Sequence, residues 1–395
     1  MASAILDIDL EHLPEEITGL SAYGRALVLV RVRGRPVAQV TVPVHDGRLG
    51  QAELADALVK AAGWHLWKQW IHDYLGWEDS TLTRADPPTA TVAICTRDRS
   101  IDLRRCLDAL LQLPDDGQEI IVIDNCPSND ATKKVVESCA RVRYVLEPRK
   151  GLDVARNRAV REARHGIVAF VDDDAMPDRG WLRALLANFD DPMVEAVTGL
   201  TIPVELETDA QETHERLSSF NRGFERRVFD ARRFNPAAAG QIGAGVNMAI
   251  RRSVFDQIGL FDEALDAGTR SRSGGDTEML ARILLYGYRI VYEPRALCRH
   301  RHRRTWRELR QMFYGYGIGV YAWWTSFAMS QKYPWMIEPA AYWLFGSQIP
   351  ALLRGVRHWH RGAPLDLAVA ELAGCAVGPW AYAAARRTAK REIAG

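Results

Sequence analysis

The stretch VAFVDDDAMPD, residues 168–178, runs from four apolar residues directly into three adjacent aspartates, Asp172, Asp173 and Asp174. A continuous apolar run of this kind predicts a strand buried on both faces, and the carboxylates then stand at its end. Three like charges repel one another and are costly to remove from water. The sequence leaves two explanations open: a solvated turn that caps the next helix, or a site for a divalent cation.

The residues around this stretch repeat a strand-then-helix pattern. Short apolar runs at 91–96, 119–125 and 142–148 predict strands, and an amphipathic segment of helical period follows each of them. Strands that alternate with helices at this spacing predict an α/β fold with a mostly parallel sheet flanked by helices. Ligands bind such sheets beyond the carboxyl ends of the strands, so the polar residues at those ends are the candidates for function.

The bulk composition is that of a globular protein, with 395 residues, 47% hydrophobic and 26% charged. A net charge of +1 gives no indication of a nucleic-acid partner, and none is expected. The six cysteines are scattered without a CxxC pair, which favours a reducing compartment. The first residues, MASAILDIDLEHLPEE, carry acids where a signal peptide needs basic residues, so a cytoplasmic location is expected.

Residues 1–86 are expected to form a small α+β domain. Residues 21–44 alternate apolar and polar side chains on both sides of Arg33-Gly34-Arg35, which predicts a β-hairpin. From 51 to 75 the apolar residues, Leu54 and Trp70 among them, recur at helical spacing, so a helix should cover the hairpin. The polar, proline-containing segment 83–89 predicts a linker to a second domain at 87–305.

Residues 306–395 are rich in aromatic side chains and follow a helical pattern. The segment 312–331 contains no charged residue and is long enough to raise the question of a membrane span. Glycine, serine and threonine interrupt it, so a single true span is not expected. Two alternatives stay open: helices packed on the preceding domain, or helices at the inner face of the cell membrane, where Trp, Tyr and basic residues gather.

The predicted carboxyl edge of the sheet carries acids rather than a phosphate-binding loop. Neither GxGxxG nor GxxxxGK[ST] follows a strand, which leaves a nicotinamide site and a P-loop without support. Asp124 ends the second strand, and Asp172 and Asp174 end the fourth. Oxygen-rich sites of this kind suit Mg²⁺ or Mn²⁺, which take further ligands from water and a substrate diphosphate.

Seven motifs follow one another along the chain: CTRDR (95–99), VIDN (122–125), GLDVARNRAV (151–160), VAFVDDDAMPDRGWL (168–182), GAGVNMAIRRSVFDQIGLFDEAL (243–265), GGDTEMLARILLYGYRIVYEP (274–294) and HRHRR (300–304). Their joint order resembles an inverting family 2 glycosyltransferase with a GT-A fold, a Rossmann-like α/β domain. The resemblance covers roughly residues 89–302. It implies a nucleotide-sugar donor and a divalent metal, Mn²⁺ or Mg²⁺.

The resemblance also implies roles for matching positions. Thr96 and Arg99, with Arg97 between them, lie in the loop that lines the nucleotide pocket, and Asp124 matches the acid that pairs with the donor base, usually uracil. The other donor-contacting positions are Arg156 and Asn157, near the ribose and diphosphate, and Asp172 with its neighbour Asp173, whose own role stays unassigned.

For the metal, the resemblance implies Asp174, with Asp172 as a further candidate that also reaches the ribose. His300 or His302 matches a late histidine that reaches the metal or the diphosphate. The alternative for these two histidines is a solvated basic segment, because CRHRHRRTWRELR is rich in arginine.

Asp276 is the candidate catalytic base implied by the resemblance, with Glu278 as the second choice. Many relatives carry Glu-Asp where this chain has Gly275-Asp276, yet the aspartate is retained. The alternative is that Asp276 only caps the following helix. Gly245 and Asn247 are expected in a close backbone wall beside the donor sugar or acceptor, or in a simple tight turn.

The reaction expected from the resemblance is one inverting displacement, in which a single base deprotonates the acceptor. A saccharide, a lipid-linked molecule, a small metabolite and a protein all stay open as acceptors. The segment 205–234 is expected to be an acceptor loop. The alternatives are a nucleotidyltransferase on a similar scaffold and a catalytically silent nucleotide-sugar-binding protein.

Overall fold

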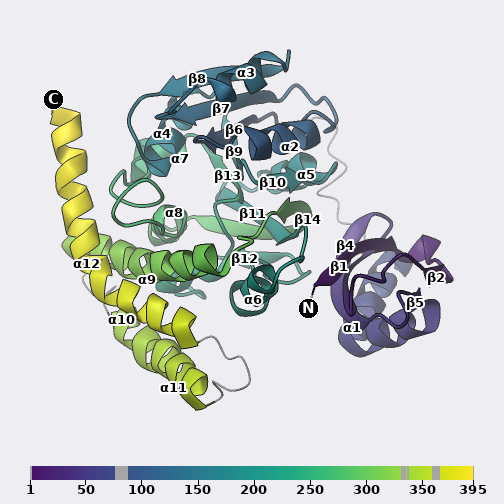
Figure 1. The fold of residues 1–395 in the computed structure, drawn as a ribbon. Helices are drawn as coiled ribbons and strands as arrows, with labels where there is room; N and C mark the ends of the chain where they lie inside the picture. The colour runs from purple at the N-terminus through teal and green to yellow at the C-terminus, as the bar shows by residue number, and fades with distance from the viewer. Residues whose placement is uncertain (1, 76–87, 331–334, 336–337, 358–364, 395) are drawn as a thin grey trace.

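A computed structural model describes residues 2–75, 88–330, 335, 338–357 and 365–394 of the chain. A nine-stranded sheet forms its centre, in the order β10-β14-β11-β13-β9-β6-β7-β8, with β12 paired to β14 (Figure 1). The strands are β6 (Thr91–Thr96), β7 (Glu119–Asn125), β8 (Val142–Glu147), β9 (Ile167–Asp172), β10 (Ala175–Pro177), β11 (Val194–Pro203), β12 (Arg227–Phe229), β13 (Asn247–Arg251) and β14 (Arg289–His300).

Four neighbouring strands, β8, β7, β6 and β9, run parallel, which confirms the strands and the parallel sheet predicted from the apolar runs. β13 joins this block to β11 by antiparallel pairing on both sides. Helices cover both faces, as an α/β sandwich requires. The core on one face includes α4 (Leu152–Glu162), α7 (Val254–Ile258) and α8 (Gly275–Leu285), and the core on the other includes α2 (Ser100–Leu110), α3 (Ala131–Glu137) and α5 (Trp181–Leu186).

The N-terminal unit has a sheet of its own. The predicted hairpin is confirmed: β3 (Arg25–Val32) and β4 (Arg35–Pro43) pair antiparallel around Arg33 and Gly34, both with positive φ. Sequence reasoning missed β1 (Ser3–Asp9), which pairs parallel to β3. A smaller ladder joins β2 (Glu16–Ile17) to β5 (Leu49–Gly50).

Helix α1 (Gln51–Tyr74) covers this sheet, with Leu54 and Leu58 buried against it. The prediction that Trp70 packs there is wrong, because its side chain is 61% exposed. The buried side chains of α1 lie in its first half, whereas Trp64 and Trp67 in its second half are 67% and 51% exposed.

The N-terminal unit is attached to the central sheet by ion pairs. Arg31 contacts Asp7 at 2.7 Å and Asp178 at 2.8 Å, and Arg299 on β14 pairs with the same two carboxylates. Leu29 packs with buried side chains of the central sheet beside this cluster. Most of the predicted linker, 83–89, lies outside the described residues, which resume at 88.

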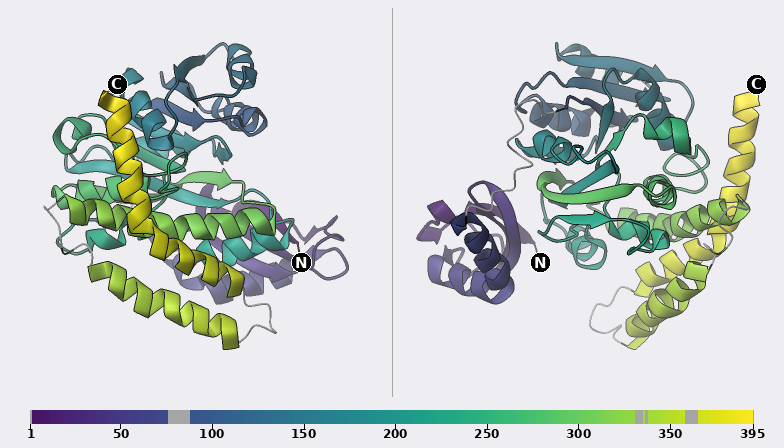
Figure 2. Two further views of the ribbon diagram at one scale, coloured as in Figure 1. Left: turned by 60° about the vertical axis from the view of Figure 1, so that its left-hand side comes forward. Right: turned by 180° about the vertical axis from the view of Figure 1, so that it is seen from behind.

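Beyond the central sheet the described residues are mostly helical (Figure 2). In α9 (Trp306–Met329), Trp323 and Phe327 belong to the main core, so the helical part of the apolar segment, 312–329, packs on the sheet domain. Three glycines let α9 and α12 (Leu365–Ala394) approach closely: a Cβ on Gly317, Gly374 or Gly378 would lie within 2.0–2.7 Å of the facing helix.

The helices between α9 and α12 present apolar side chains to solvent. They are α10 (Glu338–Trp343), a π-turn (Leu344–Gln348) and α11 (Ile349–Arg357). Tyr342, Phe345 and Leu353 are 83%, 68% and 62% exposed. Among the described residues one helical stretch, 365–391, is long and apolar enough to cross a membrane, although 39% of its most apolar window is already buried.

Candidate functional site

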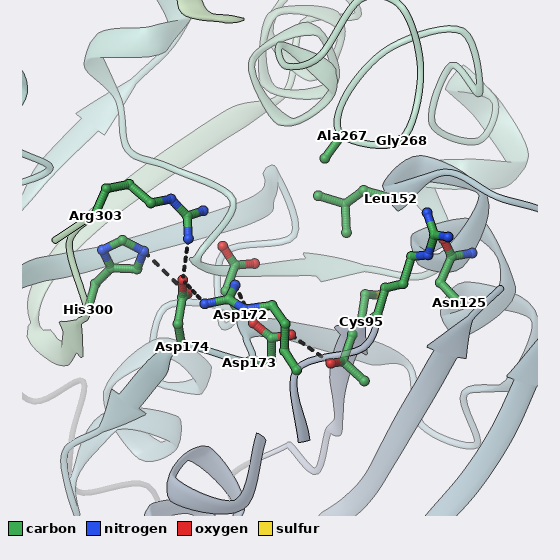
Figure 3. A pocket seen from close by; sticks show the side chains of 13 residues that line it. Cys95, Asn125, Leu152, Asp172, Asp173, Asp174, Ala267, Gly268, His300 and Arg303 are labelled. Carbon is green, nitrogen blue, oxygen red and sulfur yellow. Dashed lines mark hydrogen bonds and ion pairs between the residues drawn. The ribbon is translucent and has the colours of Figure 1, made fainter. Parts of the chain in front are cut away.

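The acidic stretch lies where three parallel strands end together. Asp172 pairs in register with Cys95, and Thr96 pairs with Asp124, so the ends of β9, β6 and β7 meet at one edge of the sheet. A pocket of about 250 Å³ opens beside them (Figure 3). It is lined by Cys95, Thr96, Arg97, Arg99, Asn125, Leu152, Asp172, Asp173, Asp174, Ala267, Gly268, His300 and Arg303.

Arg99 holds two of the three aspartates. Its guanidinium contacts Asp173 Oδ1 through Nη1 and Asp174 Oδ2 through Nη2, each at 2.8 Å. The Thr96 hydroxyl donates a hydrogen bond to Asp173 Oδ2 at 2.6 Å. Asp173 and Asp174 are buried, whereas the Asp172 side chain forms no hydrogen bond or ion pair with the residues that the structure describes (Figure 3). The sequence left the role of Asp173 unassigned. In the structure its carboxylate holds Arg99 beside the pocket.

Burial controls the electrostatics of these aspartates. Desolvation raises the pKa of Asp172 to about 6 and that of Asp173 to about 7, and repulsion from Asp174 adds to both shifts. Burial alone would also raise the pKa of Asp174, but His300 and Arg99 beside it hold that pKa below its usual range. The pocket lining thus sets three carboxylates against three arginines and His300, and Asp174 is the carboxylate held most firmly in the ionised form that a metal ligand requires.

Only one of the two candidate histidines faces the aspartates. His300 Nε2 lies 3.3 Å from Asp174 Oδ1 (Figure 3), whereas His302 Nε2 lies 3.0 Å from Glu215 Oε2 on α6 (Asp209–Ser218). Within the described parts of the chain, no three His, Cys, Asp or Glu side chains already surround an ion position. A divalent ion held by Asp174 and His300 would therefore complete its coordination with water and substrate oxygens, as such ions commonly do.

Asp124 lies at the same edge but does not line the pocket. It is fully buried, and its Oδ2 accepts a hydrogen bond from the Tyr144 hydroxyl at 2.9 Å. Burial raises its pKa. Its neighbour Asn125 does line the pocket and fixes the loop after β8, because its side chain bonds Arg149 O at 2.7 Å and Gly151 N at 2.9 Å.

Three predicted donor-contacting residues hold the scaffold in this structure instead of lining the pocket. Arg156 is buried between Asp153 and Asp266, at 2.8 and 2.7 Å. Asn157 exchanges hydrogen bonds with the backbone of Phe261, at 3.0 and 2.9 Å. Asn247 accepts from the Trp181 indole at 2.8 Å and donates to two backbone carbonyls, so its side chain is fully engaged.

Asp276 lies at the second position of α8, beside the glycine-rich segment. Its Oδ2 accepts a hydrogen bond from Gly245 N at 2.6 Å, and its Oδ1 accepts from Thr277 N at 2.7 Å. The expected N-cap position is occupied by Gly274 instead, whose φ of 103° suits glycine. A Cβ on Gly245 would lie 2.7 Å from Arg156 and 3.0 Å from Asp276, so glycine is needed for this close approach.

Glu278, two residues further along α8, is buried and pairs with Arg282 at 2.6 Å. Burial raises its pKa, and the Arg282 charge opposes that shift. Arg282 also donates to the carbonyls of Ile258 and Leu260, so this pair ties α8 to the end of α7.

The segment 205–234, expected to be a loop, contains α6 and β12. Thr208 and Gln211 form a capping box at the start of α6, a signal visible in the sequence. Sequence reasoning also missed Leu152, Ala267, Gly268 and Arg303 as lining residues of the pocket.

Comparison with known proteins agrees with this architecture. Residues 91–259 match the model of glycosyl transferase family 2. The pre-mycofactocin glycosyltransferase of Mycobacterium tuberculosis is 30% identical over 253 residues, which are 60% of this chain and 49% of that protein. The O-antigen chain rhamnosyltransferase WbaN of Salmonella anatum is 28% identical over 204 residues, 51% of this chain and 62% of that protein. The chain thus spans about half the length of the mycobacterial relative.

Among solved structures, the mannosyltransferase PcManGT from Pyrobaculum calidifontis, in complex with GDP-Man and Mn²⁺, aligns with a TM-score of 0.51 at 18% identity. The alignment covers 78% of this chain and 94% of that one. At this level of identity the likeness concerns the fold. Residues 91–259 are thus similar to family 2 glycosyltransferases, and the sheet domain has the fold of the solved GT-A mannosyltransferase, in agreement with the order of the motifs.

Proposed function

We propose that this chain transfers a sugar from a nucleoside-diphosphate donor, most simply a UDP-sugar, to an acceptor hydroxyl with inversion at the anomeric carbon. The observation that carries the proposal is the pocket at the carboxyl edge of the sheet, where Asp172, Asp174, Arg99 and His300 converge. Acids and a histidine suit a divalent ion, and arginines suit a diphosphate. The glycosyltransferase names of the relatives support the same reaction class.

The donor would lie along the strand ends. Thr96, Arg97 and Arg99 line one wall of the pocket, and Asp124, which ends the neighbouring strand β7 just outside this lining, is the proposed partner of the base. Arg303, which lies beside Asp174 in Figure 3, and Arg99 are the cations proposed to face a diphosphate. Because Arg99 already bonds Asp173 and Asp174, its guanidinium is oriented before any donor arrives.

Asp174 and His300 are the residues that would hold a divalent ion, with Asp172 as a further oxygen donor. Such an ion, Mn²⁺ or Mg²⁺, would neutralise the negative charge that builds up on the departing diphosphate. The mixed oxygen and imidazole donors fit Mn²⁺ well, and PcManGT was solved with Mn²⁺.

In the proposed reaction the acceptor oxygen attacks the anomeric carbon while the bond from that carbon to the diphosphate oxygen breaks. Asp276 takes the acceptor proton, and a single displacement inverts the centre. The hydrogen bonds from Gly245 N and Thr277 N fix this carboxylate in one orientation. Glu278 is the weaker candidate for the base, because its carboxylate is paired with Arg282.

We also propose that the protein contacts a membrane surface peripherally, on the cytoplasmic side, through α10 and α11. Their exposed Tyr342, Phe345 and Leu353 provide the apolar contact, and the acceptor would then be presented at or near that surface. A saccharide or lipid-linked acceptor agrees with this arrangement.

The decisive experiment measures what is released when UDP- and GDP-sugars are incubated with the protein and Mn²⁺, first by hydrolysis and then with candidate acceptors. Release of nucleoside diphosphate, lost in Asp174→Ala, is the expected result. Release of pyrophosphate from a nucleoside triphosphate would establish a nucleotidyltransferase instead. Tight nucleotide binding without turnover of any donor would identify a silent binding protein.

A further inference from the structure

A chain of polar side chains runs from α6 to the acidic pocket. Glu215 Oε2 lies 3.0 Å from His302 Nε2, the Nδ1 atoms of His302 and His300 lie 3.1 Å apart, and His300 Nε2 lies 3.3 Å from Asp174 Oδ1. His302 is 2% exposed and His300 8%, so water does not compete for most of these contacts. Each distance allows a hydrogen bond, and together they constrain where the protons lie.

The positions of the protons follow from the first carboxylate. An ionised Glu215 only accepts hydrogen bonds, so His302 must carry its proton on Nε2. The Nδ1 of a neutral His302 is then an acceptor, and His300 must donate to it from its own Nδ1. The Nε2 of a neutral His300 is left with a bare lone pair, which faces the Asp174 carboxylate.

Two acceptors that face each other at 3.3 Å repel unless a cation lies between them or beside them. The other oxygen of Asp174, Oδ2, already has Arg99 at 2.8 Å and Arg303 at 3.7 Å, but Oδ1 faces the imidazole. The His300 ring cannot turn away freely, because Phe220 packs edge-on against it at 5.2 Å between ring centroids. The arrangement is completed by a cation between Nε2 and Oδ1, which is either a proton on His300 or a bound metal ion.

We propose that Glu215 and His302 are positioning residues that hold His300 in the tautomer whose Nε2 binds the divalent ion beside Asp174. This inference rests on the proposed metal-dependent function and deepens it. A nitrogen ligand held in this way favours Mn²⁺ over Mg²⁺, because Mg²⁺ prefers oxygen ligands in strict octahedral geometry. The sequence-distant Glu215 thus helps to set the metal preference without touching the metal.

The test compares Glu215→Gln with the control Ser219→Ala. Glutamine has nearly the same shape but can either accept from or donate to His302, so the tautomer is no longer imposed. Ser219 donates to the other oxygen of Glu215 at 2.8 Å and makes no contact with His302, so its loss should leave the tautomer intact. Circular dichroism and thermal melting would verify that both variants are folded.

The first readout is spectroscopic and needs no turnover. In protein labelled with ¹⁵N-histidine, assigned through His300→Gln, we expect the Nε2 of His300 to give the signal of an unprotonated nitrogen. In Glu215→Gln this signal should shift toward that of a mixture of tautomers. A His300 that carries protons on both nitrogens in the unsubstituted protein would overturn the inference.

The second readout is calorimetric titration with MnCl₂ or MgCl₂ in the presence of UDP. We expect Glu215→Gln to weaken Mn²⁺ binding roughly 10–100-fold, as loss of a partner behind a metal ligand typically does, and to weaken Mg²⁺ binding much less. An unchanged ratio of the two affinities would overturn the positioning role while leaving the proposed function intact. Absence of Mn²⁺ binding to the unsubstituted protein would overturn both.

Discussion

Replacing Asp276 with asparagine separates a catalytic role from a structural one. The carboxylate accepts backbone hydrogen bonds from Gly245 and Thr277 on separate oxygens. Asparagine retains one acceptor oxygen and turns an amide nitrogen toward the other donor, so one hydrogen bond is lost. We expect the free energy of unfolding to fall by about 1–2 kcal/mol. Loss of a general base should lower kcat by about 10²–10⁴-fold, which corresponds to roughly 3–5 kcal/mol in the barrier.

The assay measures kcat with the donor found by screening, the Kd for UDP with Mn²⁺, and the melting temperature of the same preparation. Donor affinity should be nearly unchanged, because Asp276 does not line the donor pocket. The matched control is Glu278→Gln, which weakens the buried pair with Arg282 and should cost about 1–3 kcal/mol of stability with kcat within a few-fold of normal. Turnover of Asp276→Asn within tenfold of normal would refute its assignment as the base.

Three further predictions concern the C-terminal helices. Burial raises the pKa of Glu371 to about 7, so the folded state becomes less stable as pH rises from about 4.5 to 7. Glu371→Gln should therefore raise the melting temperature at pH 8 and hardly change it at pH 5. An equal effect at both pH values would contradict the raised pKa. Gly374→Ala places a Cβ 2.2 Å from a facing carbonyl and should lower the free energy of unfolding, measured with denaturant, by about 1–3 kcal/mol. The control Gly63→Ala, whose added Cβ meets nothing within 4 Å, should not lower it. Phe345→Ser with Leu353→Ser should reduce cosedimentation with anionic vesicles about tenfold or more at unchanged melting temperature, and undiminished binding would count against the membrane contact.

The sequence predicted what depends on local pattern. Buried apolar runs identified the four parallel strands. The ends of those strands identified Thr96 and the aspartates at 172–174, because the carboxyl ends of neighbouring parallel strands lie at the same edge of a sheet. It could not predict that Gly268 and Arg303 would complete the pocket, since loops far apart in the chain are brought there by tertiary packing. The partner of His302 was hidden for the same reason, because Glu215 is 87 residues away.

Asp173 and Arg156 show a second limit of sequence reasoning. A motif indicates that a polar residue matters but does not distinguish contact with a ligand from support of a neighbour. Asp173 orients Arg99, and Arg156 is enclosed by two aspartates, so both act through other side chains in this structure. Such distinctions require distances between residues.

The cluster of Asp7, Arg31, Asp178 and Arg299 has an evolutionary consequence. The four side chains come from both units of the protein, and each pairs with both opposite charges, so loss of any one removes two of the four ion pairs. The residues at these four positions are therefore expected to covary among homologues, whereas the residues of the exposed pair Arg33–Glu11 are free to vary independently. A homologue that lacks the N-terminal unit has no such reason to retain a basic residue at position 299, so covariation at these sites would record when the two units became joined.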